Sequence, residues 1–93
     1  MKIERFEDIQ AWQEARKLTK KIYELTNKFP FKRDRGLCNQ IQEASVSIMG
    51  NIAEGFDRQS KKEFTRFLDF ASASTSEVQS HLYVAMDQKY ISE

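Results

Sequence analysis

Apolar residues recur every third or fourth position along three long stretches of this sequence, which are almost free of glycine and proline. This spacing places one apolar stripe along a helix, whereas a half-buried strand would alternate apolar and polar residues. With three glycines and one proline in 93 residues, the chain has too few turn-forming residues for a β-sandwich or barrel. The sequence therefore predicts an all-α fold of three long helices.

The first two predicted helices are bounded by residues with clear conformational preferences. The first is expected at about 8–28, because Pro30 cannot continue a helix and disfavours a helical residue before it. The second is expected at about 34–53, with Asp34 as the N-cap, since its carboxylate can accept a hydrogen bond from a free backbone N–H. Gly55 is predicted to follow this helix in the left-handed conformation that glycine adopts without steric cost.

A third helix is expected at about 60–87, where Ser60 and Glu63 have the spacing of a capping box. Short connections make successive helices antiparallel, so residues 1–93 are predicted to form a single up-and-down helical-bundle domain. The third helix is the longest, and its apolar stripe runs along its whole length. We therefore expect apolar surface that a fourth helix or a neighbouring subunit would cover.

Charge and composition exclude several classes of protein. The 15 basic and 14 acidic side chains leave a formal net charge of +1, and no stretch approaches the ~20 apolar residues that cross a bilayer. The single cysteine, Cys38, cannot form an internal disulfide, and no signal peptide follows Met1, which together favour the cytoplasm. The single histidine, His81, has no partner at metal-ligand spacing, and no phosphate-binding glycine loop is present. We expect no catalysis, no metal and no cofactor.

Two clusters of basic residues are concealed by the near-neutral total. One lies along the first predicted helix and the other surrounds the start of the third. The first-helix cluster is Arg16, Lys17, Lys20 and Lys21, and the third-helix cluster is Arg58, Lys61, Lys62 and Arg66. An exposed cation at a helix N-terminus interacts unfavourably with the helix dipole, which costs about 0.3–1 kcal/mol of stability for each charge. An anionic partner such as RNA would offset that cost. A solvated polar face is the alternative interpretation.

Five aromatic side chains at helical spacing have two possible roles. They are Trp12, Tyr23, Phe64, Phe67 and Phe70. Such rings can stack on nucleic-acid bases, but at helical spacing they more typically lie in a core or a subunit interface. Tyr23 and Phe70 lie off the main apolar stripes, which favours a contact between subunits. The small residues at 71–76 predict either a closely packed seam between subunits or an exposed helix face.

Several strings along the chain resemble a known bacterial family. Residues 51–56 read Asn-Ile-Ala-Glu-Gly-Phe and are followed by Ser-Lys-Lys-Glu-Phe at 60–64, while Phe-Glu-Asp-Ile stands at 6–9. These strings are similar to those of the four-helix-bundle proteins encoded in intervening sequences of 23S rRNA genes. The accessory variability determinant of diversity-generating retroelements is a relative of that family. The resemblance extends over essentially all 93 residues.

The resemblance implies an antiparallel four-helix bundle that assembles as a homopentamer, with a proposed role in nucleic-acid binding. For the retroelement relative, that role is binding a reverse transcriptase and its template RNA. Family members usually continue into a fourth helix, of which this sequence holds at most the start after residue 87. The chain also departs from the family at Gln42 and Glu43, where two arginines are common.

The motif at 51–56 also has an interpretation from its residues alone. Asn51 and Glu54 are predicted to flank the end of the second helix, where Asn51 can bond to free backbone groups and Glu54 can pair with Arg58. Gly55 permits the chain reversal, and Ala53 completes the motif. We interpret these residues as structural, with a binding site as the alternative.

Two functions therefore compete. In the first, the protein is a non-enzymatic oligomer that binds structured RNA or DNA through its basic clusters, with an affinity that falls steeply as salt rises. In the second, it is a scaffold that docks a partner protein and has no nucleic-acid role, and its association tolerates salt.

Overall fold

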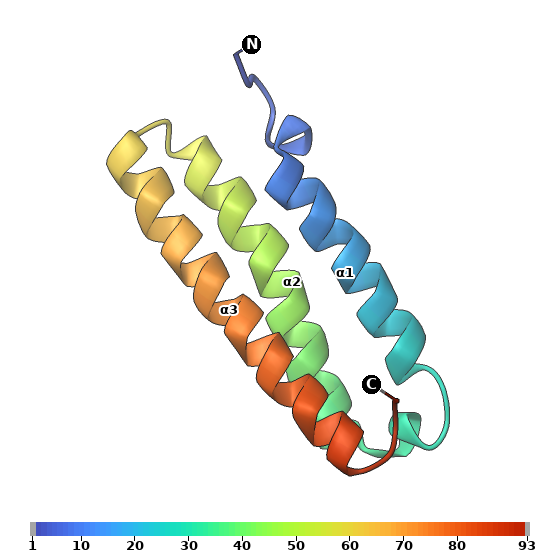
Figure 1. Ribbon diagram of the computed structural model, residues 1–93. Helices are drawn as coiled ribbons and strands as arrows, with labels where there is room; N and C mark the ends of the chain where they lie inside the picture. The colour runs from blue at the N-terminus through green and yellow to red at the C-terminus, as the bar shows by residue number, and fades with distance from the viewer. Residues whose placement is uncertain (1, 93) are drawn as a thin grey trace.

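The computed structural model describes residues 2–92, which form three long helices and no strands. Figure 1 shows α2 between α1 and α3, with each helix antiparallel to the one before it. The elements are the 3-10 helix η1 (Phe6–Asp8), α1 (Gln10–Thr26), the 3-10 helix η2 (Phe31–Arg33), α2 (Arg35–Asp57) and α3 (Lys61–Asp87). The predicted all-α, antiparallel, up-and-down arrangement is confirmed.

The core lies where α2 packs against both of its neighbours. Ile22 of α1, Ile41 of α2 and Val78 of α3 are almost completely buried and belong to one cluster. The η2 segment lies at the lower end of the bundle in Figure 1, and its Phe31 is buried in this cluster. Within residues 2–92, no helix is both long and apolar enough to span a lipid bilayer.

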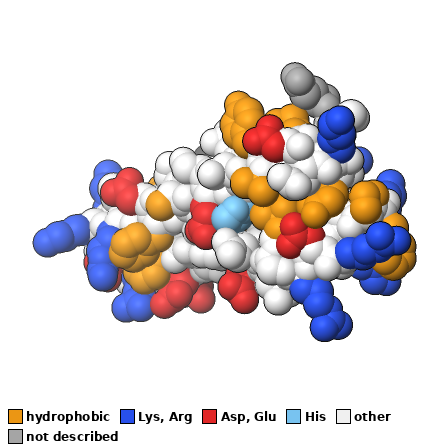
Figure 2. All heavy atoms as spheres, turned by 90° about the horizontal axis from the view of Figure 1, so that it is seen from below, with side chains coloured by type: hydrophobic (Ala, Val, Ile, Leu, Met, Phe, Trp, Pro, Cys, Tyr) orange, Lys and Arg blue, Asp and Glu red, His pale blue; other side chains and the backbone are white. Residues whose placement is uncertain are grey.

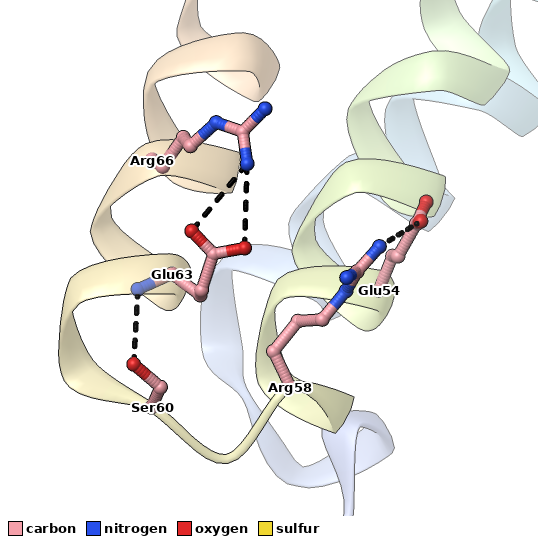
Figure 3. A network of polar contacts seen from close by, with 5 residues as sticks. All are labelled: Glu54, Arg58, Ser60, Glu63 and Arg66. Carbon is pink, nitrogen blue, oxygen red and sulfur yellow. Dashed lines mark hydrogen bonds and ion pairs between the residues drawn. The ribbon is translucent and has the colours of Figure 1, made fainter.

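Two helix starts have the predicted caps. The Asp34 carboxylate accepts a hydrogen bond from the Leu37 N–H at 3.1 Å, and Ser60 Oγ accepts one from the Glu63 N–H at 3.3 Å. Only half of the capping box forms, because the Glu63 carboxylate pairs with Arg66 instead of bonding back to Ser60 (Figure 3). Both caps arise from contacts within one turn, which explains why the sequence pattern revealed them.

Helix boundaries differ from the predicted ones at three places, one of which is the end of α1 at Thr26 rather than near residue 28. Helix α1 begins at Gln10 rather than near residue 8, because residues 6–8 form the separate η1 turn. Helix α2 continues to Asp57, four residues beyond the predicted end at 53, so Gly55 is helical. The prediction of a left-handed Gly55 is wrong: the left-handed residue of this turn is Gln59, with a φ of 53°.

Gly55 has a different structural role, which is to allow α2 and α3 to approach closely. A Cβ atom at this position would lie 2.5 Å from the Cβ of Phe67 and 3.2 Å from Cδ1 of Phe64. No other residue type fits that separation without movement of a helix. Glycine is therefore required here by packing between helices rather than by backbone conformation.

The small residues at 71–76 pack partly within the chain. Ala71 and Ser74 are buried, and the Ser74 hydroxyl lies 2.9 Å from the Ser47 hydroxyl of α2. Ser72 and Ala73 are exposed. The stretch therefore combines a seam between α2 and α3 of one chain with an exposed face.

Helices α1 and α3 both pack on α2 and leave an apolar groove between them. We call this the apolar groove; its volume is about 380 Å³, and its lining includes Ala15, Leu18, Ile48, Ile52, Leu68 and Ala71. The expected uncovered apolar surface is thus present. Residues 88–92 do not begin a fourth helix: Tyr90 stacks on Phe31 with ring centroids 5.2 Å apart and donates a hydrogen bond to Asp34 at 3.1 Å.

Cys38 is expected to react slowly with thiol reagents in the native protein. Its side chain is buried, and its Sγ lies 3.3 Å from the carbonyl oxygen of Phe31. Burial raises the pKa of the thiol, and the nearby Asp34 carboxylate acts in the same direction. Because the thiolate is the nucleophile, labelling at about pH 8 should be roughly tenfold or more slower than in urea. Equal rates in the two conditions would show that the contact between η2 and α2 is open.

Candidate nucleic-acid interface

The two predicted basic clusters lie on different parts of the molecule. The first-helix cluster lies along α1, and the third-helix cluster surrounds the turn between α2 and α3. All eight side chains are exposed. The surroundings of the two clusters differ, and this difference decides which of them is the better candidate for an interface.

Much of the charge of the third-helix cluster is neutralised locally. Arg58 lies 3.1 Å from the Glu54 carboxylate and Arg66 lies 3.3 Å from the Glu63 carboxylate (Figure 3). Both guanidinium groups also lie over the Phe67 ring, at 5.0 and 5.8 Å from its centroid. These pairs are exposed and add little stability, but they leave less charge free for phosphates.

Three of the four residues of the first-helix cluster line one groove. Arg16, Lys17 and Lys20 line one groove together with Trp12 and Arg5. The Arg16 guanidinium lies 5.8 Å from the centroid of the Trp12 ring. Lys17 is 3.8 Å from the Glu14 carboxylate.

A second groove begins at Lys20 and runs between the end of α1 and the start of α2. We call it the end groove; its volume is about 580 Å³, and it contains Lys20, Lys32 and Arg35 from three different elements. Within residues 2–92, none of these three cations has a carboxylate within 4 Å. Glu24 is the acidic residue of the groove.

Lys32 and Arg35 are site residues that the sequence pattern did not reveal. They are far from Lys20 along the chain, and neither lies on the helix that carries it. The available signal was the excess of basic over acidic residues in residues 1–35. That signal shows that positive charge is concentrated in this region but does not show which residues converge.

Polar side chains form the floor and wall of the end groove. Gln42 of α2 donates a hydrogen bond from Nε2 to the Thr26 hydroxyl at 2.9 Å. Thr26 is buried and donates to the Ile22 carbonyl, also at 2.9 Å. Asn39 and Tyr23 also line the groove, together with Asn27 and Cys38, and Tyr23 is 47% exposed. The groove therefore offers cations, amides and one aromatic face.

Most residues of the 51–56 motif pack within the bundle, whereas the Glu54–Arg58 pair lies on its surface. Asn51 donates from Nδ2 to the carbonyl oxygen of Ser47 at 2.9 Å and to its hydroxyl at 3.0 Å, so it lies within α2 and not at the predicted helix end. Glu54 pairs with Arg58 as expected, and Gly55 contacts Phe67. Ala53 is half-buried. These contacts support the structural interpretation of the motif.

The single histidine lies on α3, and its side chain is largely buried. His81 Nε2 is buried without a hydrogen-bond partner and lies 3.5 Å from the Glu77 carboxylate. Figure 2 shows the imidazole beside a carboxylate, with hydrophobic side chains nearby. Among residues 2–92, no three His, Cys, Asp or Glu side chains gather closely enough to hold a metal ion.

The fold and its surface define a class: a small protein of antiparallel helices with a basic groove on one face and an apolar groove elsewhere. A family model described as 23S rRNA-intervening sequence protein matches residues 7–93, and the chain belongs to that family. No curated protein and no solved structure matches the chain. Membership of this family, whose function is unclear, does not assign a specific role.

Proposed function

We propose that this protein acts without catalysis as an oligomer that binds structured RNA or DNA through the basic face of α1. The observation that carries this proposal is the end groove, where Lys20, Lys32 and Arg35 converge without a carboxylate within 4 Å in residues 2–92. Exposed cations without acidic partners are free to displace the counterions of a phosphate backbone.

The basic face is continuous, which suits an extended polyanion. Lys20 lines both the end groove and the groove that contains Arg16 and Lys17. A nucleic-acid strand can therefore contact cations along the length of α1. The near-neutral total charge does not oppose this, because residues 1–35 hold ten basic and six acidic side chains.

An oligomer would present several copies of this face. Phe70, Tyr83 and Val84 of α3 are large apolar residues that are exposed, and they offer surface for contacts between subunits. The family resemblance suggests a pentamer. Several copies of one weak groove bind a single polyanion more tightly than one copy does, because each later contact is intramolecular.

Fluorescence anisotropy with a labelled structured RNA tests the proposal at two salt concentrations. We expect micromolar or tighter binding at low salt and a roughly tenfold or greater loss between about 50 and 200 mM salt, because released counterions rebind at high salt. Replacing Lys20, Lys21, Lys61 and Lys62 with glutamate should abolish binding while the helical circular dichroism signal remains. Unchanged binding by that variant would contradict the proposal.

A scaffold role is the second candidate, and the apolar groove favours it. Leu18, Ile52 and Leu68 line this groove from three helices, and a partner protein's amphipathic helix could cover them. Such association would survive high salt. Leu68→Glu, at a half-exposed position, should then abolish partner capture and leave RNA binding unchanged. If replacing the four lysines with glutamate abolished RNA binding and no partner protein were captured, the first candidate would be favoured.

A further inference from the structure

We propose that the end groove holds one unpaired nucleotide, with its phosphate on the three cations and its base on the Tyr23 ring. This inference rests on the proposed nucleic-acid function and specifies the form of nucleic acid that is bound. The groove is about 580 Å³, within the roughly 300–1,000 Å³ range of small-molecule sites, so one nucleotide fits it.

The phosphate subsite is formed by convergence from three elements. Lys20 comes from α1, Lys32 from η2 and Arg35 from the first turn of α2. A row of cations on one helix would follow a backbone, whereas cations from three elements that line one groove can reach a single anion. Arginine adds a planar pair of N–H donors that matches two phosphate oxygens.

The base subsite is the exposed ring of Tyr23. Its side chain is 47% exposed although it lines the groove beside the buried Thr26. Within residues 2–92, no other aromatic ring stacks on it. A contact between subunits was the expected role of this residue, but its place among cations and amides favours a nucleobase, since base–aromatic stacking is typical of single-strand binding.

Amide groups at the edge of the subsite can bond to a base. The Gln42 amide is held by its hydrogen bond to Thr26, and its Oε1 accepts no hydrogen bond from a group in residues 2–92. Asn39 lies one turn before it on α2 and lines the same groove. A free amide offers the donors and acceptors that base edges require.

An unpaired nucleotide explains this combination better than a duplex or an acidic peptide. The bases of a duplex are stacked on one another and are not available to Tyr23, and A-form RNA presents a deep major groove that side chains do not enter. An acidic peptide would use the cations but would leave the ring and the amides without a partner.

The test compares a hairpin RNA with a single-stranded loop and a blunt RNA duplex of the same length, using anisotropy at low salt. The full-length protein should prefer the hairpin. Tyr23→Ala should weaken hairpin binding by about fivefold to a hundredfold, while duplex binding changes less than about twofold, because the lost contact is stacking on one base. Tyr23→Phe is the matched control, and it should retain hairpin binding because the ring remains.

Several outcomes would overturn the inference. One is that Tyr23→Ala weakens hairpin and duplex binding equally, and another is that it weakens neither. A third is that polyglutamate displaces the hairpin as readily as an oligonucleotide of equal charge does. Asn39→Ala, at another exposed position, provides a second variant that should weaken hairpin binding if Tyr23→Ala lowers the helical signal. If wild-type protein bound neither RNA, the proposed function itself would fail, whereas salt-sensitive binding insensitive to Tyr23 would overturn only this inference.

Discussion

The Gly55→Ala variant is expected to unfold well below the wild-type temperature, although alanine is the better helix former. The new Cβ would lie 2.5 Å from Cβ of Phe67 and 3.3 Å from its Cγ. Because a Cβ atom cannot rotate away, relief requires α2 and α3 to separate near their shared turn. Overpacking of this kind costs about 1–3 kcal/mol, which exceeds the gain from helix propensity. In a chain of this size, that corresponds to roughly 4 °C or more of the melting temperature.

Gly50→Ala is the matched control because the same change is made on the same helix. Gly50 is exposed in the middle of α2, and a Cβ there would have no atom within 4 Å. The alanine should therefore stabilise the protein by about 0.5–1 kcal/mol. Thermal and urea unfolding followed by circular dichroism measure both variants. Stabilisation by both alanines would mean that α2 and α3 leave room for a Cβ atom at Gly55.

The second large effect is expected from reversing charges in the end groove. Lys20→Glu combined with Arg35→Glu should reduce RNA affinity about a hundredfold at low salt and lower the salt slope by about two, since two phosphate contacts are lost. The groove would also become repulsive to an anion. Anisotropy titrations at four or five salt concentrations provide both quantities.

The matched control reverses two charges outside the groove. Lys61→Glu combined with Lys62→Glu changes the net charge by the same amount, at exposed positions at the start of α3. In the titrations at about 0.1 M salt, we expect this control pair to lose less than about tenfold in affinity, because long-range attraction is screened over about 10 Å there. Equal losses from the two pairs would show that binding depends on total charge or on both clusters, and not on the end groove.

Local features of the fold were predictable from single residues. Asp34 and Ser60 cap α2 and α3 as their positions indicated, and the Glu54–Arg58 pair forms one turn apart. Each of these contacts joins groups within four residues of each other, so sequence spacing contains the necessary information. The end of α2 was predicted less well, because Gly55 is required by the close approach of Phe67 on α3 and not by a turn in the backbone.

The candidate site was only partly predictable, because it joins residues from different elements. Lys20 was identified from its cluster on α1, but Lys32 and Arg35 join it only because the chain reverses direction through η2. The third-helix cluster is the weaker candidate for binding phosphates because Arg58 and Arg66 pair with acidic neighbours. Whether such pairs form depends on side-chain geometry. Charge counts along the chain do not distinguish paired from unpaired cations.

The helices and two of their caps follow from the order of the residues, because helix periodicity and capping act over one or two turns. The excess of basic residues near the N-terminus is also a property of the sequence. In contrast, the packing role of Gly55, the set of cations that share a groove and the apolar face that stays uncovered all arise from the tertiary structure. Those properties depend on how closely α2 approaches its neighbours, and the separation of two helices is set by all the side chains packed between them.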